Sequence, residues 1–246
     1  MNGYIASILA GMCTGFGALP LIFLKKITKT FEDILLGFAA GIMIFAASFS
    51  LVLPALNTDG IEQVVFGMLT GAIVLAMIEK IIPNINMGQV RNTDFQDKEF
   101  VKTVMMIAAI AIHNIPEGFA IGIGYASGSK DTGLILALAI GIQNAPEGLI
   151  VSAPLLEKGY SKTKAILFAF LAGIGEPIAA TLGIVAGSFC KTLMPFALSF
   201  AAGAMYYVVS HELIPESHCH GNQMKATFGV IGGFIIMLLL ENYIKT

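Results

Sequence analysis

The sequence is poor in charged residues, which make up 12% of its 246 positions, against about 25% in an ordinary soluble domain. The 14 Lys and Arg residues nearly balance the 16 Asp and Glu residues, and no stretch is basic enough to neutralise a run of phosphates. These features exclude a soluble fold and make nucleic acid an implausible partner. The three cysteines have no CxxC spacing, so neither a disulfide framework nor a thiolate zinc ribbon is indicated.

The chain consists instead of apolar runs, with 56% hydrophobic residues and a mean hydropathy of +0.82. Each run has about 20 residues, enough to cross a hydrocarbon core of roughly 30 Å. We therefore predict an all-α integral membrane protein, a single polytopic transmembrane domain over residues 1–246. Its eight predicted spans are 3–24, 34–56, 61–82, 101–126, 132–156, 165–188, 194–216 and 225–244.

The distribution of positive charge predicts the orientation of these spans. Eleven of the 14 Lys and Arg residues lie in or beside the loops after the first, third, fifth and seventh spans, and three lie on the opposite side. Positive charge is retained in the cytoplasm, so the longest loop, about 83–100, is predicted to be cytoplasmic and both termini non-cytoplasmic. The expected location is a cell membrane, either the plasma or an inner membrane.

Three predicted spans contain polar residues near their centres. Residues 113–118 read HNIPEG, residues 143–148 read QNAPEG, and Glu176 precedes a proline. A carboxylate at mid-membrane costs on the order of 3 kcal/mol. Because no lysine or arginine lies at that depth, the charge of Glu117, Glu147 and Glu176 must be neutralised by protons or by bound metal ions.

The spacing of these residues favours metal. Residues four apart share a helix face, so His113 lies beside Glu117 and Gln143 beside Glu147. A mixture of nitrogen and oxygen donors suits first-row divalent metals better than Mg²⁺ or Ca²⁺. The N-x-P-E-G pattern recurs in neighbouring antiparallel spans, which predicts a pseudo-symmetric repeat about the membrane midplane, as many secondary transporters have.

A purely structural role for these polar residues is the alternative interpretation. Protonated glutamates could hydrogen-bond to Asn114, Asn144 and Gln143 and so hold the helices together. Three acids, one imidazole and three adjacent prolines, each of which frees a backbone carbonyl, are more than such a role requires. The cation site is therefore the preferred interpretation.

Further residues are candidates for an accessory or relay role. Met43 in the second span is either a soft ligand or a core-filling side chain. The end of the seventh span carries His211, Glu212, His218 and His220, together with Glu216 and Cys219. This segment of histidine, carboxylate and thiol is either a metal relay to the cytosol or an ordinary hydrated helix end.

The paired HNIPEG and PEG motifs resemble those of the ZIP (Zrt/Irt-like) divalent metal transporters. The QNAPEG form and Gly175-Glu176-Pro177 are similar to the GufA-like branch of that family. The resemblance covers the whole chain and implies a two-metal centre. One position would use His113, Glu117, Gln143 and Glu147, with Met43 as a further candidate, and the other Asn114, Glu117, Asn144, Glu147 and Glu176.

The resemblance also implies a homodimer, an elevator-type moving bundle, and transport of Zn²⁺ into the cytosol, with Fe²⁺, Mn²⁺ or Cd²⁺ as other cargoes. Two features depart from the family pattern. Asn144 stands where some relatives have aspartate, and the histidine-rich cytoplasmic loop of many relatives is absent.

The predicted function is thus a divalent-metal transporter and not an enzyme. A membrane sensor of metal or protons without net flux is an alternative. An intramembrane metallohydrolase is a weaker one, because Pro215 replaces the second histidine of an H-E-x-x-H motif that would begin at His211.

Overall fold

The protein is entirely helical and turn-like in the residues that its computed structural model describes, which are 2–24, 27–57, 60–81, 112–128, 130–189 and 191–245. The predicted loop 83–100 and residues 101–111 of the fourth predicted span lie outside them. The α-helices are α1 (Gly3–Gly17), α2 (Lys29–Phe45), α3 (Leu53–Leu56), α4 (Ile61–Ile81), α6 (Lys130–Glu157), α7 (Lys162–Ala172), α8 (Gly175–Phe189), α9 (Met194–Val208), α10 (Ile214–His218) and α11 (Gln223–Lys245), and residues 112–126 are also helical.

Within the described residues, seven helical segments are long and apolar enough to cross a membrane. They are Gly3–Ile22, Lys29–Leu56, Ile61–Lys80, Asp131–Leu156, Lys162–Ser188, Lys191–His218 and Gln223–Lys245. Each overlaps one predicted span, and the described part of the remaining span is the helix over 112–126. The prediction of an all-α membrane protein is confirmed, whereas the count of eight spans stays a prediction.

Side-chain caps and glycines set several helix ends. The side chain of Thr28 accepts a hydrogen bond from the backbone of Phe31 at the start of α2, and Ser161 does the same for Lys164 at the start of α7. Such caps satisfy amides that have no partner within the helix. Gly159 and Gly221, with φ of 86° and 84°, lie in the turns after α6 and α10, where a left-handed conformation favours glycine.

Two spans change register where a proline follows. The π-helical segment η2 (Ala46–Val52) lies between α2 and α3, and the π-helical segment η4 (Val209–Leu213) lies between α9 and α10. Pro54 and Pro215 each stand two residues after such a segment. Proline has no amide to donate to the helix, and π-helical turns accompany functional sites in many helices. The segments η2 and η4 therefore change the direction in which the side chains that follow them point.

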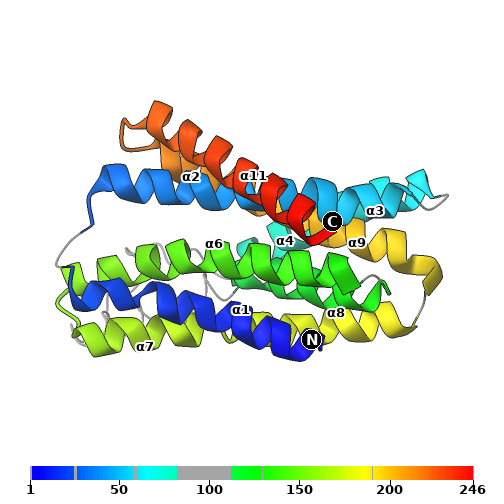
Figure 1. Ribbon diagram of the computed structural model, residues 1–246, viewed down its shortest axis with the longest axis horizontal. Helices are drawn as coiled ribbons and strands as arrows, with labels where there is room; N and C mark the ends of the chain where they lie inside the picture. The colour runs from blue at the N-terminus through cyan, green and yellow to red at the C-terminus, as the bar shows by residue number, and fades with distance from the viewer. Residues whose placement is uncertain are drawn as a thin grey trace.

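The helices form two bundles that lie side by side (Figure 1). The first bundle contains α1, α6, α7, α8 and the helix over 112–126, and the second contains α2, α3, α4, α9, α10 and α11. Within the second bundle α2 packs chiefly on α11 and α4 on α9, and within the first α1 packs on α6. The turns after α1, α6 and α10 lie at one end of the molecule, and both termini lie toward the other (Figure 1).

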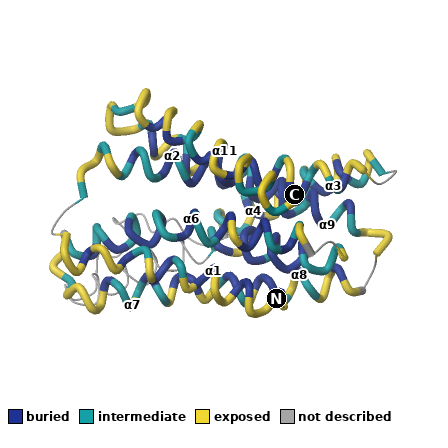
Figure 2. Tube along the Cα trace, viewed as in Figure 1, coloured by how far each residue is buried: buried dark blue, intermediate teal, exposed yellow. Residues whose placement is uncertain are grey.

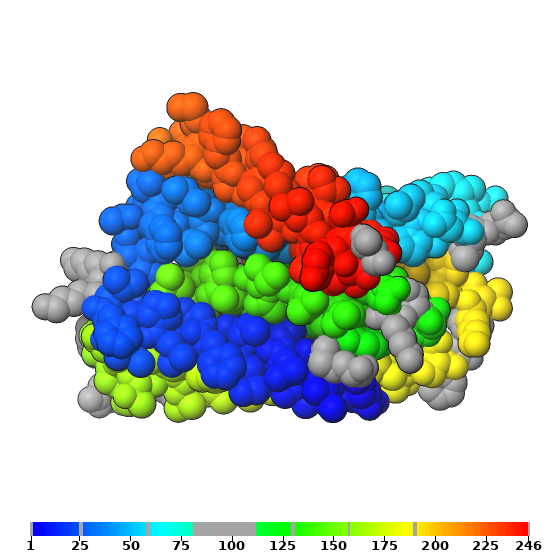
Figure 3. All heavy atoms as spheres, viewed as in Figure 1, coloured from blue at the N-terminus to red at the C-terminus, as the bar shows by residue number. Residues whose placement is uncertain are grey.

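Apolar side chains cover much of the outside of the molecule. Buried positions concentrate where helices face one another (Figure 2), whereas α11, which forms a ridge along the second bundle (Figure 3), exposes Phe228, Ile231 and Leu239 among other large apolar residues. A soluble monomer rarely exposes apolar patches of this size. This distribution is the one expected when lipid is the solvent.

Candidate metal centre

One imidazole and two carboxylates meet inside the first bundle. His113 and Glu117 come from the helix over 112–126, and Glu147 comes from α6. Their potential ligand atoms all lie within 4.8 Å of one another. Glu117 is fully buried and Glu147 is 6% exposed. The structure therefore brings together the two halves that the i, i+4 spacing predicts.

The ring of His113 is oriented by the second bundle. Its Nδ1 lies 2.9 Å from Oε2 of Glu212 in η4, and its Nε2 lies 3.8 Å from Oε1 of Glu147. An ionised carboxylate can only accept, so Nδ1 donates to Glu212 and Nε2 is the nitrogen that faces Glu147. Carboxylates hold metal-binding histidines in this way in many proteins. Glu212 thus contacts the centre through the ring of His113.

Gln143 lies between the two carboxylates but presents its nitrogen to them. Its Nε2 donates to Oε1 of Glu117 and, at 3.4 Å, to Oε1 of Glu147. The resemblance implies an oxygen ligand at this position. Half a turn of the amide group would exchange the two atoms, because oxygen and nitrogen occupy equivalent places on the same planar group.

A second polar group adjoins the first. Asn144 donates from Nδ2 to Oε1 of Glu176 at 2.5 Å and to the backbone oxygen of Ala10 at 2.9 Å. Asn114 donates from Nδ2 to the backbone oxygen of Ala172 at 3.1 Å. Ala172 is the last residue of α7, and the helix is interrupted there before α8 begins at Gly175. The amide of Asn114 therefore satisfies a carbonyl that the helix end leaves without a partner.

The glycine that ends each PEG motif allows another helix to approach. A Cβ atom at Gly118 would overlap the backbone of Glu176, and one at Gly148 would overlap the backbone of Thr14 in α1. The absence of a side chain at Gly118 thus allows the backbone of Glu176 to lie against the helix that carries Glu117. Close approach of backbones at small residues is the common basis of helix packing in membranes.

The buried oxygens of these side chains are short of donors. Five buried oxygens have no hydrogen-bond partner among the described residues: Oδ1 of Asn114, Oε2 of Glu117, Oε1 of Gln143, Oδ1 of Asn144 and Oε2 of Glu176. No lysine or arginine of the described residues forms an ion pair with these carboxylates. An unpaired buried polar group costs about 1–3 kcal/mol, and a cation would satisfy several of them at once.

The other candidate residues are dispersed. Met43 is fully buried in the apolar core. Nε2 of His211 lies 3.8 Å from Glu79 in α4, and both nitrogens of His218 have protein partners, among them Thr227 in α11 at 3.2 Å. His220 contacts Asp33. These histidines do not form one cluster.

A cavity of about 560 Å³ connects the centre with the end of α10. Its lining includes His113, Glu147 and Glu212, and also Glu216 and Cys219. Glu216 and Cys219 belong to the polar end of the seventh span that the sequence singles out as a candidate relay. Asp33 and Glu79 were missed by the sequence analysis.

Comparison with known proteins agrees with this chemistry. The family model described as "ZIP Zinc transporter" matches residues 91–241. The chain is 37% identical to "Zinc transporter GufA" of Myxococcus xanthus over 97% of both chains. The chain belongs to the ZIP zinc transporter family.

Other ZIP relatives are similar to it over most of their length. "Zinc transporter ZIPB" of Bordetella bronchiseptica is 36% identical over 93% of this chain and 76% of its own, and "Zinc transporter ZupT" of Streptococcus mutans is 32% identical over 96% and 95%. The predictions of a ZIP transporter of the GufA type, of a multi-pass membrane protein and of a function that is not enzymatic are confirmed.

Proposed function

We propose that this ZIP transporter carries Zn²⁺, or a similar divalent transition metal, into the cytosol through the centre built on His113, Glu117 and Glu147. The observation that carries the proposal is the set of buried oxygens without donors, grouped around one imidazole, with no lysine or arginine of the described part of the chain paired to them. Such a set can compensate the dehydration of a divalent cation at mid-membrane. The donor types suit zinc, with Fe²⁺, Mn²⁺ and Cd²⁺ as further cargoes.

The centre is proposed to hold two ions. The first would bind to His113, Glu117, Gln143 and Glu147, with Met43 as a further candidate, and the second to Asn114, Glu117, Asn144, Glu147 and Glu176. The two glutamates of the PEG motifs would bridge the ions. The adjoining positions of the Gln143 and Asn144 hydrogen-bond groups support this division, because consecutive residues of one helix point to different neighbours.

The proposed orientation has eight spans with both termini outside the cytoplasm. The turns after α1, α6 and α10, which hold or adjoin most of the described Lys residues, lie at one end of the molecule, and the termini lie toward the other (Figure 1). The cavity beside His113 is also lined by Cys219, next to the turn after α10. Release from the centre toward the positively charged side, which is cytoplasmic by the charge rule, is therefore the inward direction.

Movement of the first bundle against the second is the proposed way of changing access. The principal donors, His113, Glu117, Glu147 and Glu176, all belong to the first bundle, and the second contributes the contact from Glu212. Close backbone approaches, such as those at Gly118 and Gly148, join helices within a bundle. Each bundle can therefore move as a unit. The homodimer remains a prediction from the family resemblance.

Zinc uptake into vesicles tests the proposed function. Purified protein in liposomes should take up Zn²⁺, and Glu117→Ala and Glu147→Ala should each reduce uptake to the level of empty vesicles, because each removes a carboxylate shared by both positions. Glu62→Ala, at an exposed position in the first turn of α4, is the matched control and should transport normally.

Wild-type rates in Glu117→Ala or Glu147→Ala, with normal reconstitution, would contradict the assignment of the centre. Binding of zinc by the wild-type protein without any uptake would instead indicate a sensor.

A further inference from the structure

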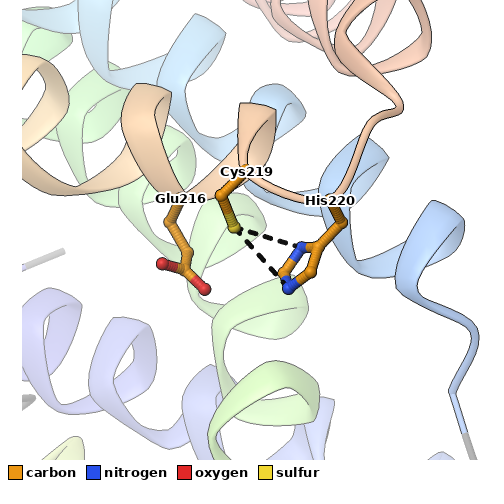
Figure 4. Close-up of side chains that lie close together, drawn as sticks. All are labelled: Glu216, Cys219 and His220. Atoms are coloured by element: carbon orange, nitrogen blue, oxygen red, sulfur yellow. Dashed lines mark hydrogen bonds between the residues drawn. The ribbon is translucent and has the colours of Figure 1, made fainter.

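A second group of potential ligands lies at the end of α10. Figure 4 shows the side chains of Glu216, Cys219 and His220 turned toward one another. One potential ligand atom from each lies within 4.8 Å of the others, and all three residues are exposed. A carboxylate, a thiol and an imidazole together form a mixed donor set of the type that binds zinc.

The sulfur of Cys219 lies beside the ring of His220. Sγ is 3.3 Å from Nδ1 and 3.6 Å from Nε2. Zinc bonds of about 2.3 Å to sulfur and about 2.0 Å to nitrogen, at a tetrahedral angle, also place the two ligand atoms roughly 3.5 Å apart, with the ion in line with the lone pair of Nε2. A shared ion therefore requires the Cys219 side chain to rotate away from Nδ1 toward the outer side of Nε2.

A fully buried carboxylate orients His220 from the neighbouring helix. Nδ1 of His220 lies 2.9 Å from Oδ1 of Asp33 in α2, and Nδ2 of Asn222 donates to Oδ2 of the same carboxylate at 2.9 Å. The Asn222 amide is itself fixed by Thr30, whose hydroxyl lies 3.0 Å from its Oδ1. Because Asp33 accepts the Nδ1 proton, Nε2 of His220 remains free to bind a metal. Carboxylates that orient the histidine ligands of metals are typical of zinc sites.

The local charge is also suited to a cation. The pKa of the Cys219 thiol is raised by partial desolvation and by the negative charges of Glu216 and Asp33. The same negative charges attract a divalent ion, and coordination would displace the thiol proton to solvent.

We propose that Glu216, Cys219 and His220 form a transfer site for a zinc-like divalent ion, with Asp33 as the positioning residue. Three protein ligands leave one position of a tetrahedral ion open, and open sites exchange their ions whereas closed four-ligand sites retain them. Glu216 and Cys219 line the same cavity as His113 and Glu147. An ion that leaves the centre therefore meets this site next. Binding at the site does not depend on the proposed function, and only the source of the ion does.

Cobalt titration of the purified full-length protein in detergent tests the binding directly. Co²⁺ bound to a thiolate gives a charge-transfer absorption that oxygen and nitrogen ligands alone do not give. The wild-type protein should show this band, and Cys219→Ser should abolish it. Cys13→Ser and Cys190→Ser are matched controls and should retain it. The absence of the band in the wild-type protein, or its persistence in Cys219→Ser, would overturn the proposal.

Two histidine variants and one positioning variant refine the test. His220→Gln should weaken Co²⁺ binding at least tenfold, whereas His218→Gln, whose ring contacts α11 instead, should not change it. Asp33→Asn should keep the band but require about 10–100-fold more Co²⁺. Equal binding by His220→Gln and His218→Gln would show that His220 is not a ligand.

Variants of the centre separate this proposal from the proposed function. Glu117→Ala should lose zinc uptake and keep the cobalt band, because the two sites use different residues. Cys219→Ser should lose the band and slow uptake severalfold without abolishing it. An unchanged uptake rate in Cys219→Ser would overturn the transfer role, and loss of the band in Glu117→Ala would show that the thiolate does not form a separate site.

Discussion

Asn144 is the most informative position at which to test the second metal site. Its Nδ2 donates both to Oε1 of Glu176 at 2.5 Å and to the backbone oxygen of Ala10 at 2.9 Å. Asn144→Asp removes both donors and places a carboxylate against these acceptors. Two unit charges about 4 Å apart repel by about 4 kcal/mol at an effective dielectric constant of 20, and uptake of a proton by the pair relieves part of this cost.

We therefore expect Asn144→Asp to lose about 2–4 kcal/mol of stability in the presence of a chelator, a fall in Tm on the order of 10 °C for a chain of this length. Excess Zn²⁺ should reverse the loss, because the new carboxylate becomes a ligand and ligand binding stabilises the folded state. The assay is thermal unfolding in detergent, with chelator and with zinc.

The charge-swapped double variant is the control. In Asn144→Asp with Glu176→Gln, the new glutamine can donate to the new aspartate, so most of the stability in chelator should return, and the coupling follows from the double-mutant cycle. If Asn144→Asp melts with the wild-type protein in chelator, or if the double variant is as unstable as Asn144→Asp alone, the contact between these residues does not have the energetic role assigned to it.

Three further predictions concern the histidine, its partner and the orientation. Zinc binding needs His113 without its second proton, so the affinity of the wild-type protein for zinc should weaken as the pH falls from about 7.5 to about 5.5. His113→Gln should bind zinc more weakly at high pH, and its affinity should depend less on pH. If the affinity of His113→Gln depends on pH as steeply as that of the wild-type protein, the competing protons belong to the glutamates. Glu212→Leu should weaken zinc affinity about 10–100-fold and Glu212→Gln much less, because the glutamine oxygen can still accept from Nδ1 of His113; equal effects would exclude an orienting role. In a variant with the native cysteines replaced by serine, Asp131→Cys should react with impermeant reagents outside the cell and Lys158→Cys should not, and the opposite pattern would reverse the proposed direction of transport.

Hydrophobic run lengths predict the spans well because a bilayer imposes a minimum length on every helix. The apolar runs at 61–82 and 225–244 correspond closely to Ile61–Lys80 and Gln223–Lys245. The register changes at Ala46–Val52 and Val209–Leu213 were not predicted. A proline in the sequence indicates a lost hydrogen bond but does not specify whether the helix kinks, breaks or widens.

The candidate sites were predictable where residues are close in the sequence and less so where they come from distant helices. The i, i+4 rule places His113 beside Glu117 from local geometry alone. The contacts of His113 with Glu212 and of Asp33 with His220 join residues 99 and 187 positions apart. Such pairs depend on how helices pack, which periodicity does not determine. The same limit explains why the spacing could not show that the amide nitrogen of Gln143 faces the carboxylates.

Locating the metal by anomalous X-ray scattering tests the central claim most directly. Crystals of the wild-type protein grown with Zn²⁺ should give an anomalous peak at the zinc edge about 2.0–2.2 Å from Nε2 of His113 and from oxygens of Glu117 and Glu147. A second peak about 3.5–4 Å away, beside Glu176, is expected for a bridged pair of ions. Zinc peaks confined to exposed side chains, with none between the helix over 112–126 and α6, would contradict the account.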